Sequence, residues 1–234
     1  MRKLISLRDP KSPVSESYRA IRTNIEFSNL DGDIKTICVT SSMKNEGKST
    51  VIANLAVSFR KLDKKVLLID GDLRNPSLHK LFNIDNDKGL TNILLRKNEF
   101  EECIKIEEGL HILTGGYIPP NPSEVLSSKL MREFMGNIRD KYDYIFVDAP
   151  PIGIVTDAGI ISSYSDGVIF VVESNRTDSK IVKDAKARLD KINANILGVI
   201  VNKFDIKGSD YGYYGYYYSD DDKKSRRKKK RRKK

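Results

Sequence analysis

The chain has 234 residues, of which 39% are hydrophobic, and a formal net charge of +10. This length suits one α/β domain with tails, and two full domains would be cramped. The hydrophobic fraction can build a core, which excludes a wholly disordered chain. Residues 219–234 hold eleven Lys or Arg against three Asp, so residues 1–218 carry only +2. A basic nucleic-acid-binding body is therefore not expected.

The sequence shows no membrane-spanning run and no secretion signal. No stretch approaches about 18 consecutive apolar residues, and residues 1–13 lack the apolar segment of a signal peptide. Cys38 and Cys103 lie far apart and provide neither a disulfide framework nor a C-x-x-C metal motif. We therefore expect a protein of the reducing cytosol.

Apolar periodicity and turn residues predict alternating helices and strands along the chain. Ser12 and Pro13 are typical of the N-cap and first position of a helix over residues 13–28. Short β-rich runs predict strands at 36–40, 66–69, 110–113, 144–147, 168–172 and 196–201. Helical spacing of apolar residues predicts helices at 48–62, 123–141, 156–164 and 178–192.

The predicted strands are continuous apolar runs rather than alternating ones. Buried parallel strands have this pattern because helices cover both faces of their sheet. Alternation of strands and helices therefore predicts the α/β class, with a doubly wound, mostly parallel sheet. Ligands of such sheets bind at the carboxyl ends of the strands, and three of the predicted strands end in polar, reactive residues.

Residues 42–49 have the spacing S-x-x-x-x-G-K-S, between strand 36–40 and helix 48–62. This strand–loop–helix context is the one that a P-loop requires. Backbone N–H groups and the helix N-terminus attract phosphate, Lys48 adds charge for the β- and γ-phosphates, and the Ser49 hydroxyl can bind Mg²⁺. Ser42 stands where the usual pattern has its first glycine. The nucleotide-binding residues predicted in this loop are Ser42, Asn45, Glu46, Gly47, Lys48, Ser49 and Thr50.

Two of the predicted strands end in carboxylates. Asp70 and Asp72 follow strand 66–69, and Asp148 follows strand 144–147. Carboxylates that face a phosphate loop can hold Mg²⁺ directly or through water. If the strand persists, Asp70 and Asp72 leave it on one side, and one pKa of such a close pair is raised, so one can act as base and the other hold metal. Each Asp alone is better explained as a helix cap or turn residue.

Together these motifs resemble the three Walker motifs of bacterial tyrosine kinases: the P-loop, D-x-D-x-R at 70–74 and D-x-P-P at 148–151. In particular, the chain resembles the stand-alone cytoplasmic kinases of capsule and exopolysaccharide synthesis in Gram-positive bacteria. The resemblance covers about residues 1–218, and it includes Glu16-x-x-Arg19-x-x-Arg22, the NPS segment at 121–123 and a Tyr-rich C-terminus.

The resemblance implies an ATP-dependent, Mg²⁺-using tyrosine kinase that phosphorylates itself. Lys48 and Ser49 would bind the triphosphate and Mg²⁺, and Ser49, Asp72 and Asp148 would organise the metal. Asp70 would accept the proton of the attacking tyrosine, which a carboxylate assists because a phenol has a pKa of about 10. The sequence leaves open whether Asp70 or Asp72 is the base. Asn202, at the end of the last strand, would touch the adenine ring, or is a simple turn residue.

The resemblance also implies partners and a location. A separate transmembrane activator and a cognate tyrosine phosphatase are expected, with the kinase at the inner face of the cell membrane and a role in polysaccharide synthesis and export. Glu16, Arg19 and Arg22 would join subunits of a homo-oligomeric ring. The alternative for these three residues is a solvated, charged helix face.

The C-terminal segment holds six of the chain's eleven tyrosines, within residues 211–218. Interleaved glycines and the lack of aliphatic residues argue against a packed strand. The predicted phosphate acceptors are Tyr211, Tyr213, Tyr214, Tyr216, Tyr217 and Tyr218. The alternative is a low-complexity aromatic segment with a binding or aggregation role.

The basic run at residues 223–234 is predicted to hold the chain at an anionic membrane surface. Phosphotyrosines beside it would weaken that attraction. The alternative is a solvated tail, and nucleic acid is not an expected partner. The expected division of the chain is an N-terminal helix at 1–30, a P-loop kinase domain at 31–207 and a flexible tail at 208–234.

Two other functions fit parts of this pattern. A partitioning or division-site ATPase would carry a second lysine five residues before the P-loop lysine, where this chain has Met43. Such an ATPase would also lack the tyrosine cluster. The second alternative is a non-enzymatic, membrane-associated scaffold whose tail does the binding. An iron–sulfur reductase of this fold is excluded because the chain has two cysteines.

Overall fold

The computed structural model describes residues 4–30 and 32–205. By its internal contacts the chain divides into Met1–Lys203 and Phe204–Lys234. The sheet and its helices belong to the first unit, and of the second the structure describes Phe204 and Asp205. The predicted tyrosine acceptors at 211–218 and the basic run at 223–234 lie outside the described residues.

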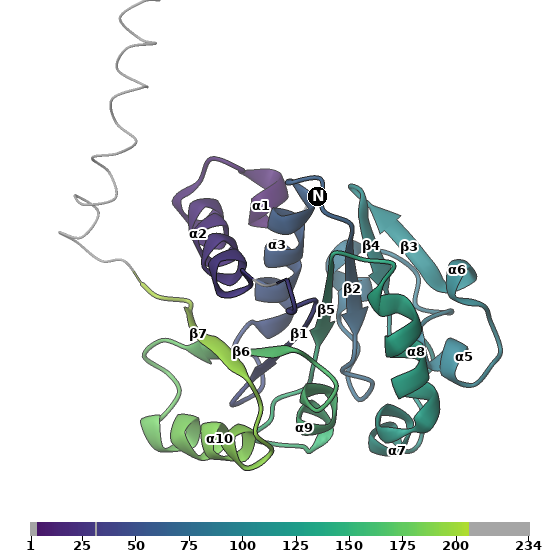
Figure 1. Ribbon diagram of the computed structural model, residues 1–234. Coiled ribbons are helices and arrows are strands. Elements are labelled where there is room, and N and C mark those ends of the chain that lie inside the picture. The colour runs from purple at the N-terminus through teal and green to yellow at the C-terminus, as the bar shows by residue number, and fades with distance from the viewer. Residues whose placement is uncertain (1–3, 31, 206–234) are drawn as a thin grey trace, which may run out of the picture. The chain divides into compact units, whose positions relative to one another are not determined.

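A seven-stranded sheet in the order β3-β4-β2-β5-β1-β6-β7 forms the centre of the first unit (Figure 1). Its strands are β1 (Thr36–Ser41), β2 (Val66–Asp70), β3 (Ile104–Glu107), β4 (Leu110–Leu113), β5 (Tyr144–Asp148), β6 (Gly167–Glu173) and β7 (Ile196–Asn202). β3 runs antiparallel to β4, and the other neighbouring pairs are parallel. The doubly wound, mostly parallel sheet is therefore confirmed, with all six predicted strands present.

Ten helices surround the sheet within the described ranges. They are α1 (Ile5–Arg8), α2 (Pro13–Ser28), α3 (Lys48–Arg60), α4 (Leu78–Phe82), α5 (Leu90–Leu94), α6 (Phe100–Cys103), α7 (Pro122–Ser127), α8 (Lys129–Arg139), α9 (Asp157–Ser162) and α10 (Ser179–Lys191). The predicted start of α2 is confirmed, because the Ser12 side chain accepts a hydrogen bond from Ser15 N.

The single helix predicted at 123–141 is wrong, because the chain forms α7 and α8 there instead. Ser128, between them, has an extended backbone with φ −61° and ψ 155°, which a helix cannot contain. Its hydroxyl accepts a hydrogen bond from Met131 N at 3.1 Å and so caps α8. A capping serine inside a periodic apolar pattern therefore breaks one predicted helix into two.

Two apolar cores lie on opposite faces of the sheet, because alternate strand residues point to opposite sides. On one face, α1 to α4 cover strand residues such as Ile37 and Phe146; Tyr18 and Ile25 of α2 belong to this core. On the other face, α5 to α10 cover residues such as Val147 (Figure 1).

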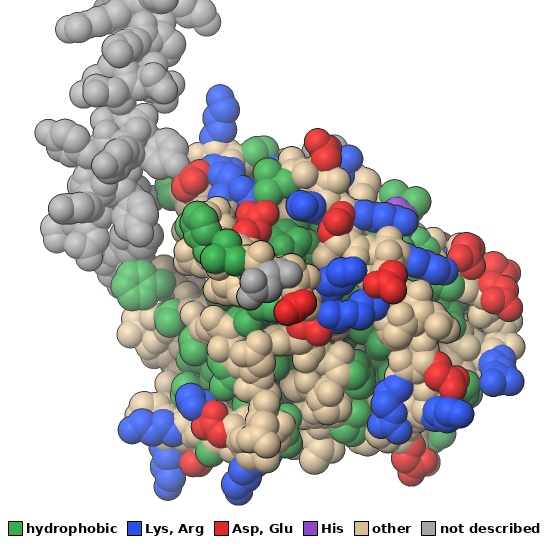
Figure 2. All heavy atoms as spheres, viewed as in Figure 1, with side chains coloured by type: hydrophobic (Ala, Val, Ile, Leu, Met, Phe, Trp, Pro, Cys, Tyr) green, Lys and Arg blue, Asp and Glu red, His purple; other side chains and the backbone are tan. Residues whose placement is uncertain are grey.

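The surface agrees with the nearly neutral charge calculated for residues 1–218. Figure 2 shows acidic and basic side chains intermixed over the visible face of the described part.

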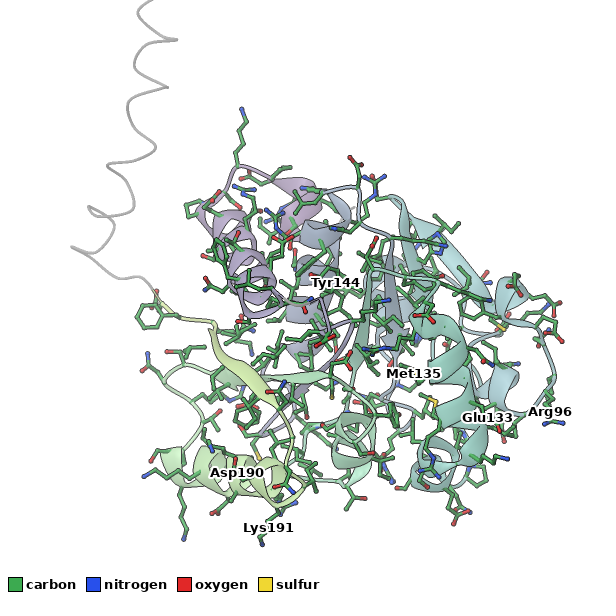
Figure 3. All side chains as sticks on the ribbon, in the orientation of Figure 1. Arg96, Glu133, Met135, Tyr144, Asp190 and Lys191 are labelled. Carbon is green, nitrogen blue, oxygen red and sulfur yellow. The ribbon has the colours of Figure 1, made fainter. Side chains whose placement is uncertain are left out.

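Helix α8 has one buried and one exposed face. Of its two residues labelled in Figure 3, Met135 is buried in the core that α5 to α10 cover, and Glu133 is exposed. In the described part of the chain, no helix has the length and apolar character needed to cross a membrane.

Candidate active site

The P-loop connects β1 to α3 at the carboxyl edge of the sheet. Asn45 and Gly47 both have positive φ angles, 66° and 90°, and such alternation turns successive N–H groups into a concave anion site. The loop borders a cavity of about 620 Å³, a size typical of small-molecule sites. The residues that line the cavity are Lys44, Asn45, Gly47, Lys48, Ser49, Thr50, Asp72, Arg74, Asn75, Ser77, Lys80, Leu81, Pro150, Pro151, Ile154, Val155 and Lys203.

Lys48 joins the P-loop to both acidic strand ends. Its Nζ lies 3.2 Å from Asp72 Oδ2 and 3.2 Å from Asp148 Oδ1. Burial alone would lower the pKa of Lys48, but the carboxylates of Asp148 and Asp72 raise it above its usual value. The structure therefore brings together the three charged residues that the sequence predicted to act together.

Asp70 is buried and lies apart from this pair of contacts. Its Oδ2 accepts hydrogen bonds from the backbone N–H groups of Ser77 at 2.8 Å and Leu78 at 2.9 Å, at the start of α4. Its Oδ1 has no partner among the described residues. Burial raises the pKa of Asp70 to about 7, and the nearby Asp148 carboxylate adds to the shift.

Asp70 and Asp72 would leave the strand on one side only if the strand persisted through both residues, and it does not. β2 ends at Asp70, and Asp72 lies in the turn that follows. The carboxylate that raises the pKa of Asp70 is consequently that of Asp148. Asp72 lines the cavity with Lys48, whereas Asp70 is fully buried beneath it.

Oxygen donors suitable for Mg²⁺ gather around Lys48. Burial raises the pKa of Asp148 above its usual value, although the Lys48 charge and a hydrogen bond with the Ser49 hydroxyl act in the opposite direction. Asp148 Oδ2 is buried without a partner in the described ranges, so this atom can still accept a ligand bond. Carboxylate and hydroxyl oxygens are the donors that Mg²⁺ prefers alongside water and phosphate. The donor set of Ser49, Asp72 and Asp148 therefore fits this metal.

The other predicted P-loop residues divide between the cavity and the interior. Asn45 and Thr50 line the cavity, whereas the Ser42 hydroxyl donates a hydrogen bond to the Glu46 carboxylate beneath the loop, at 2.9 Å. Asn202 Nδ2 donates to the Glu46 carbonyl oxygen at 2.8 Å. A Cβ on Gly47 would lie 2.2 Å from this Nδ2, so the loop and Asn202 pack closely.

The charged residues of α2 lie away from the cavity and make contacts within the chain. Arg19 pairs with Glu16 and donates to the Pro10 carbonyl oxygen at 2.7 Å. Arg22 donates to the Ser58 carbonyl oxygen of α3 at 2.8 Å. These contacts are compatible with either expectation, a charged helix face or a subunit contact.

An ion pair beside the cavity was not among the predicted site residues. Arg74 Nε donates to Asp157 Oδ2 at 2.7 Å, and Arg74 Nη2 donates to Ser123 Oγ at 2.9 Å. Ser123 Oγ donates in turn to Asp157 Oδ1 at 2.6 Å. Arg74 in D-x-D-x-R and Ser123 in the NPS segment were visible motif residues, but no local pattern marks Asp157 as their partner.

Comparisons with known proteins agree with this geometry. The ParA family profile, described as "NUBPL iron-transfer P-loop NTPase", matches residues 33–232. The chain is 45% identical to tyrosine-protein kinase YwqD of Bacillus subtilis over 92% of each chain. It is 39% identical to the putative tyrosine-protein kinase CapB of Staphylococcus aureus, over 88% of this chain and 91% of CapB.

A solved structure has the same fold over most of the chain. The crystal structure of the chimerical protein CapA2B2 matches with a TM-score of 0.83 and 38% identity, over 86% of this chain and 89% of that one. Both kinase relatives match this chain over most of its length and most of their own. The chain therefore belongs to the ParA-type P-loop family and, within it, to the bacterial tyrosine kinases.

Proposed function

We propose that this tyrosine kinase binds ATP and Mg²⁺ in the 620 Å³ cavity and transfers the γ-phosphoryl group to tyrosines of its own C-terminal segment. The observation that carries the proposal is the position of Lys48. Lys48 extends from the first turn of α3, lines the cavity together with Asp72, and contacts both Asp72 and the buried Asp148.

The side chains around the cavity have separable roles in this proposal. Backbone N–H groups of the P-loop and the N-terminus of α3 hold the phosphates, and Lys48 reaches the β- and γ-phosphate oxygens. Ser49, Asp72 and Asp148 would hold Mg²⁺, which supplies positive charge against the phosphate oxygens when it is bound. Asp70 is the proposed proton acceptor for the tyrosine hydroxyl, through the Oδ1 atom that has no partner in residues 4–30 and 32–205.

The assignment of the base can be tested against Asp72, which lines the cavity itself. Asp72→Asn should raise the Mg²⁺ concentration needed for half-maximal activity, because it removes a metal ligand. Asp70→Asn should lower kcat while leaving that Mg²⁺ concentration within about threefold of wild type, an effect in the 10²–10⁴-fold range of general-base catalysis. The reverse pattern would assign the base to Asp72.

The direct test of the function is intact mass after incubation with ATP and Mg²⁺. The wild-type chain should gain phosphates, and Lys48→Met should gain none while keeping its fold. Lys64→Met is the matched control, because Lys64 is exposed and precedes β2 at the opposite edge of the sheet. Phosphate incorporation that persists in Lys48→Met would refute the proposal.

The acceptors are proposed to be the six tyrosines of residues 211–218. The domain ends at Asn202 and Lys203, which both contact the P-loop, and eight residues separate Asn202 from Tyr211. That linker spans at most about 30 Å, which limits how far Tyr211 can lie from Asn202. Replacing all six by Phe should remove most of the incorporated phosphate.

Transfer between subunits can be distinguished from transfer within one chain. We propose a homo-oligomeric ring in which Glu16, Arg19 and Arg22 contact a neighbour, so that a neighbour's site meets the tail at high effective concentration. Lys48→Met should then be phosphorylated when mixed with an active chain that lacks residues 211–234. Alanine at the three α2 positions should reduce both assembly and this transfer.

The remaining proposals concern the membrane and the biological setting. We propose that a transmembrane protein activates the kinase, that a tyrosine phosphatase reverses its autophosphorylation, and that the cycle regulates capsular or exopolysaccharide synthesis. The basic run at 223–234 would hold the chain at the inner face of the membrane. Co-sedimentation with anionic vesicles tests this: deleting 223–234 should abolish binding, and prior phosphorylation should weaken it.

A further inference from the structure

A carboxylate is buried inside the P-loop. Glu46 is 1% exposed and lies between Asn45 and Gly47, two P-loop residues with positive φ. Its side chain is absent from the lining of the cavity, which its neighbours on both sides share. The Glu46 side chain therefore belongs to the interior of the loop rather than to its phosphate-facing surface.

Four neutral donors surround the Glu46 carboxylate. Within the loop, Ser42 Oγ donates to Oε1 at 2.9 Å and Met43 N donates to Oε2 at 2.7 Å. From outside the loop, Glu173 N at the end of β6 donates to Oε1 at 3.2 Å, and Thr177 Oγ1, between β6 and α10, donates to Oε1 at 2.5 Å. The carboxylate thus forms hydrogen bonds within the P-loop, and it also connects the P-loop to the segment at the end of β6.

Further contacts tie the same part of the P-loop to the end of β7. Asn202 Nδ2 donates to the Glu46 carbonyl oxygen at 2.8 Å. Lys203 Nζ donates to the Asn45 carbonyl oxygen at 2.7 Å and pairs with Glu173 Oε2 at 3.0 Å. Asn202 and Lys203 thereby hold two backbone carbonyl oxygens of the loop. The Glu46 carboxylate is held by Glu173 and Thr177.

We propose that Glu46 is a positioning residue that preorganises the phosphate-binding loop by accepting hydrogen bonds from Ser42 and Met43 within it and from Glu173 and Thr177 beside it. The inference rests on the proposed nucleotide site and adds a role that a P-loop motif does not specify. A loop already held in its binding conformation loses less entropy when the phosphates bind.

The chemistry of the carboxylate explains why an amide cannot replace it. Each Glu46 oxygen accepts a bond from one backbone N–H group, Oε1 from Glu173 and Oε2 from Met43. A hydroxyl can rotate and accept a hydrogen bond instead of donating one, but a backbone N–H can only donate. In Glu46→Gln the side-chain NH₂ must face one of these two N–H groups, whichever way it is flipped. The loop then relaxes to free that donor, and nucleotide binding has to restore the strained arrangement.

The test measures the affinity of ADP with Mg²⁺ by calorimetry, together with KM for ATP, kcat and Tm. Leaving a buried donor unsatisfied corresponds to a loss of about 10- to 100-fold in affinity. Glu46→Gln should show that loss in ADP affinity and a matching rise in KM, with kcat at saturating ATP within about threefold of wild type. A folded Glu46→Gln chain that binds ADP within twofold of wild type overturns the inference.

Two further variants keep the test decisive if Glu46→Gln does not fold. Thr177→Val removes one donor without changing side-chain shape and should weaken ADP binding several-fold, whereas Thr177→Ser keeps the hydroxyl and should bind as wild type. Equal binding by Thr177→Val and Thr177→Ser contradicts the role of Glu46.

A control for stability alone comes from the opposite edge of the sheet. Asp166 Oδ2 accepts bonds from the N–H groups of Lys35 at 2.8 Å and Thr36 at 2.7 Å. Asp166→Ala should lower Tm without changing ADP affinity. If Asp166→Ala also loses ADP affinity, then a fall in stability alone weakens binding, and the result for Glu46→Gln no longer supports the role of Glu46. Absence of ADP binding by the wild-type chain instead refutes the proposed nucleotide site, and with it this role for Glu46.

Discussion

Replacing Arg74 by Ala should destabilise the domain by leaving a buried charge without its partner. The Asp157 carboxylate is 0% exposed, and it accepts bonds from Arg74 Nε at 2.7 Å and Nη2 at 3.1 Å. The same arginine holds Ser123 of α7. Arg74 therefore connects the turn that carries Asp72 to both α7 and α9.

The size of the effect follows from burial on the two sides of the pair. Removing one partner of a fully buried ion pair costs about 3–5 kcal/mol. Here the Arg74 side chain is 42% exposed, so water already screens part of the interaction, and Ser123 Oγ still donates to Asp157 at 2.6 Å. We therefore expect a loss of about 1–3 kcal/mol, in the range of hydrogen bonds to charged groups.

The pH dependence of that loss has a definite sign. Burial alone would raise the pKa of Asp157, but the hydrogen bonds from Arg74 and Ser123 lower it below its usual value. A carboxyl whose pKa is lower in the folded state contributes stability above its unfolded pKa of about 4, and this contribution is lost as the pH falls. The difference in stability between wild type and Arg74→Ala should therefore shrink on acidification.

Urea unfolding at pH 7 and at about pH 3.5 measures both quantities. Asp157→Asn provides the second corner of a double-mutant cycle, since it removes the charge that Arg74→Ala strands. The double variant should be less destabilised than the sum of the two single variants. An unfolding free energy of Arg74→Ala within about 0.5 kcal/mol of wild type at pH 7 would refute the reasoning, as would a difference that stays constant with pH.

Three other substitutions have expected outcomes. Gly47→Ala should weaken ADP binding by about tenfold or more, because its Cβ would lie 2.2 Å from Asn202 Nδ2 and its φ is +90°. Gly136→Ala is the control: its added Cβ would have no neighbour within 4 Å, so this variant should bind ADP as wild type does in the same titration. Phe59→Ala should cost about 3–5 kcal/mol in urea unfolding, because this 0% exposed ring packs against two others; a loss below 1 kcal/mol would contradict that packing. Ser128→Ala should cost about 1 kcal/mol through the lost cap of α8, and an unchanged Tm would argue against the cap.

The elements that sequence reasoning predicted well are those whose pattern is set by burial. Residues 145–147 of β5, for example, are buried on both faces of the sheet, so this part of the sequence is a continuous apolar run. The P-loop was predictable because its glycine, lysine and serine follow a strand and open a helix. In both cases local sequence and tertiary environment require the same residues.

Other features depended on contacts that the local sequence does not encode. β3 was missed because Ile104–Glu107 is short, mixed in polarity and at the edge of the sheet. It forms a hairpin with β4 through Glu108 and Gly109, which both have positive φ, and a glycine at this turn was the available signal. Thr177 lies 131 residues from its partner Glu46 along the chain, and Asp157 lies 83 residues from its partner Arg74. The order of the strands in the sheet brings these distant residues together.

That strand order also predicts which substitutions around the P-loop should lower kcat and which should raise KM. β1, which leads into the loop, lies between β5 and β6. On the β5 side, Lys48 contacts Asp148 and, beyond it, Asp72 after β2. On the β6 side, Glu46 contacts Thr177, and its carbonyl oxygen accepts from Asn202 after β7. Changes on the first side remove groups proposed to act on the reacting phosphate and should lower kcat. Changes on the second side disturb the shape of the loop that must receive any phosphate, and should chiefly raise KM.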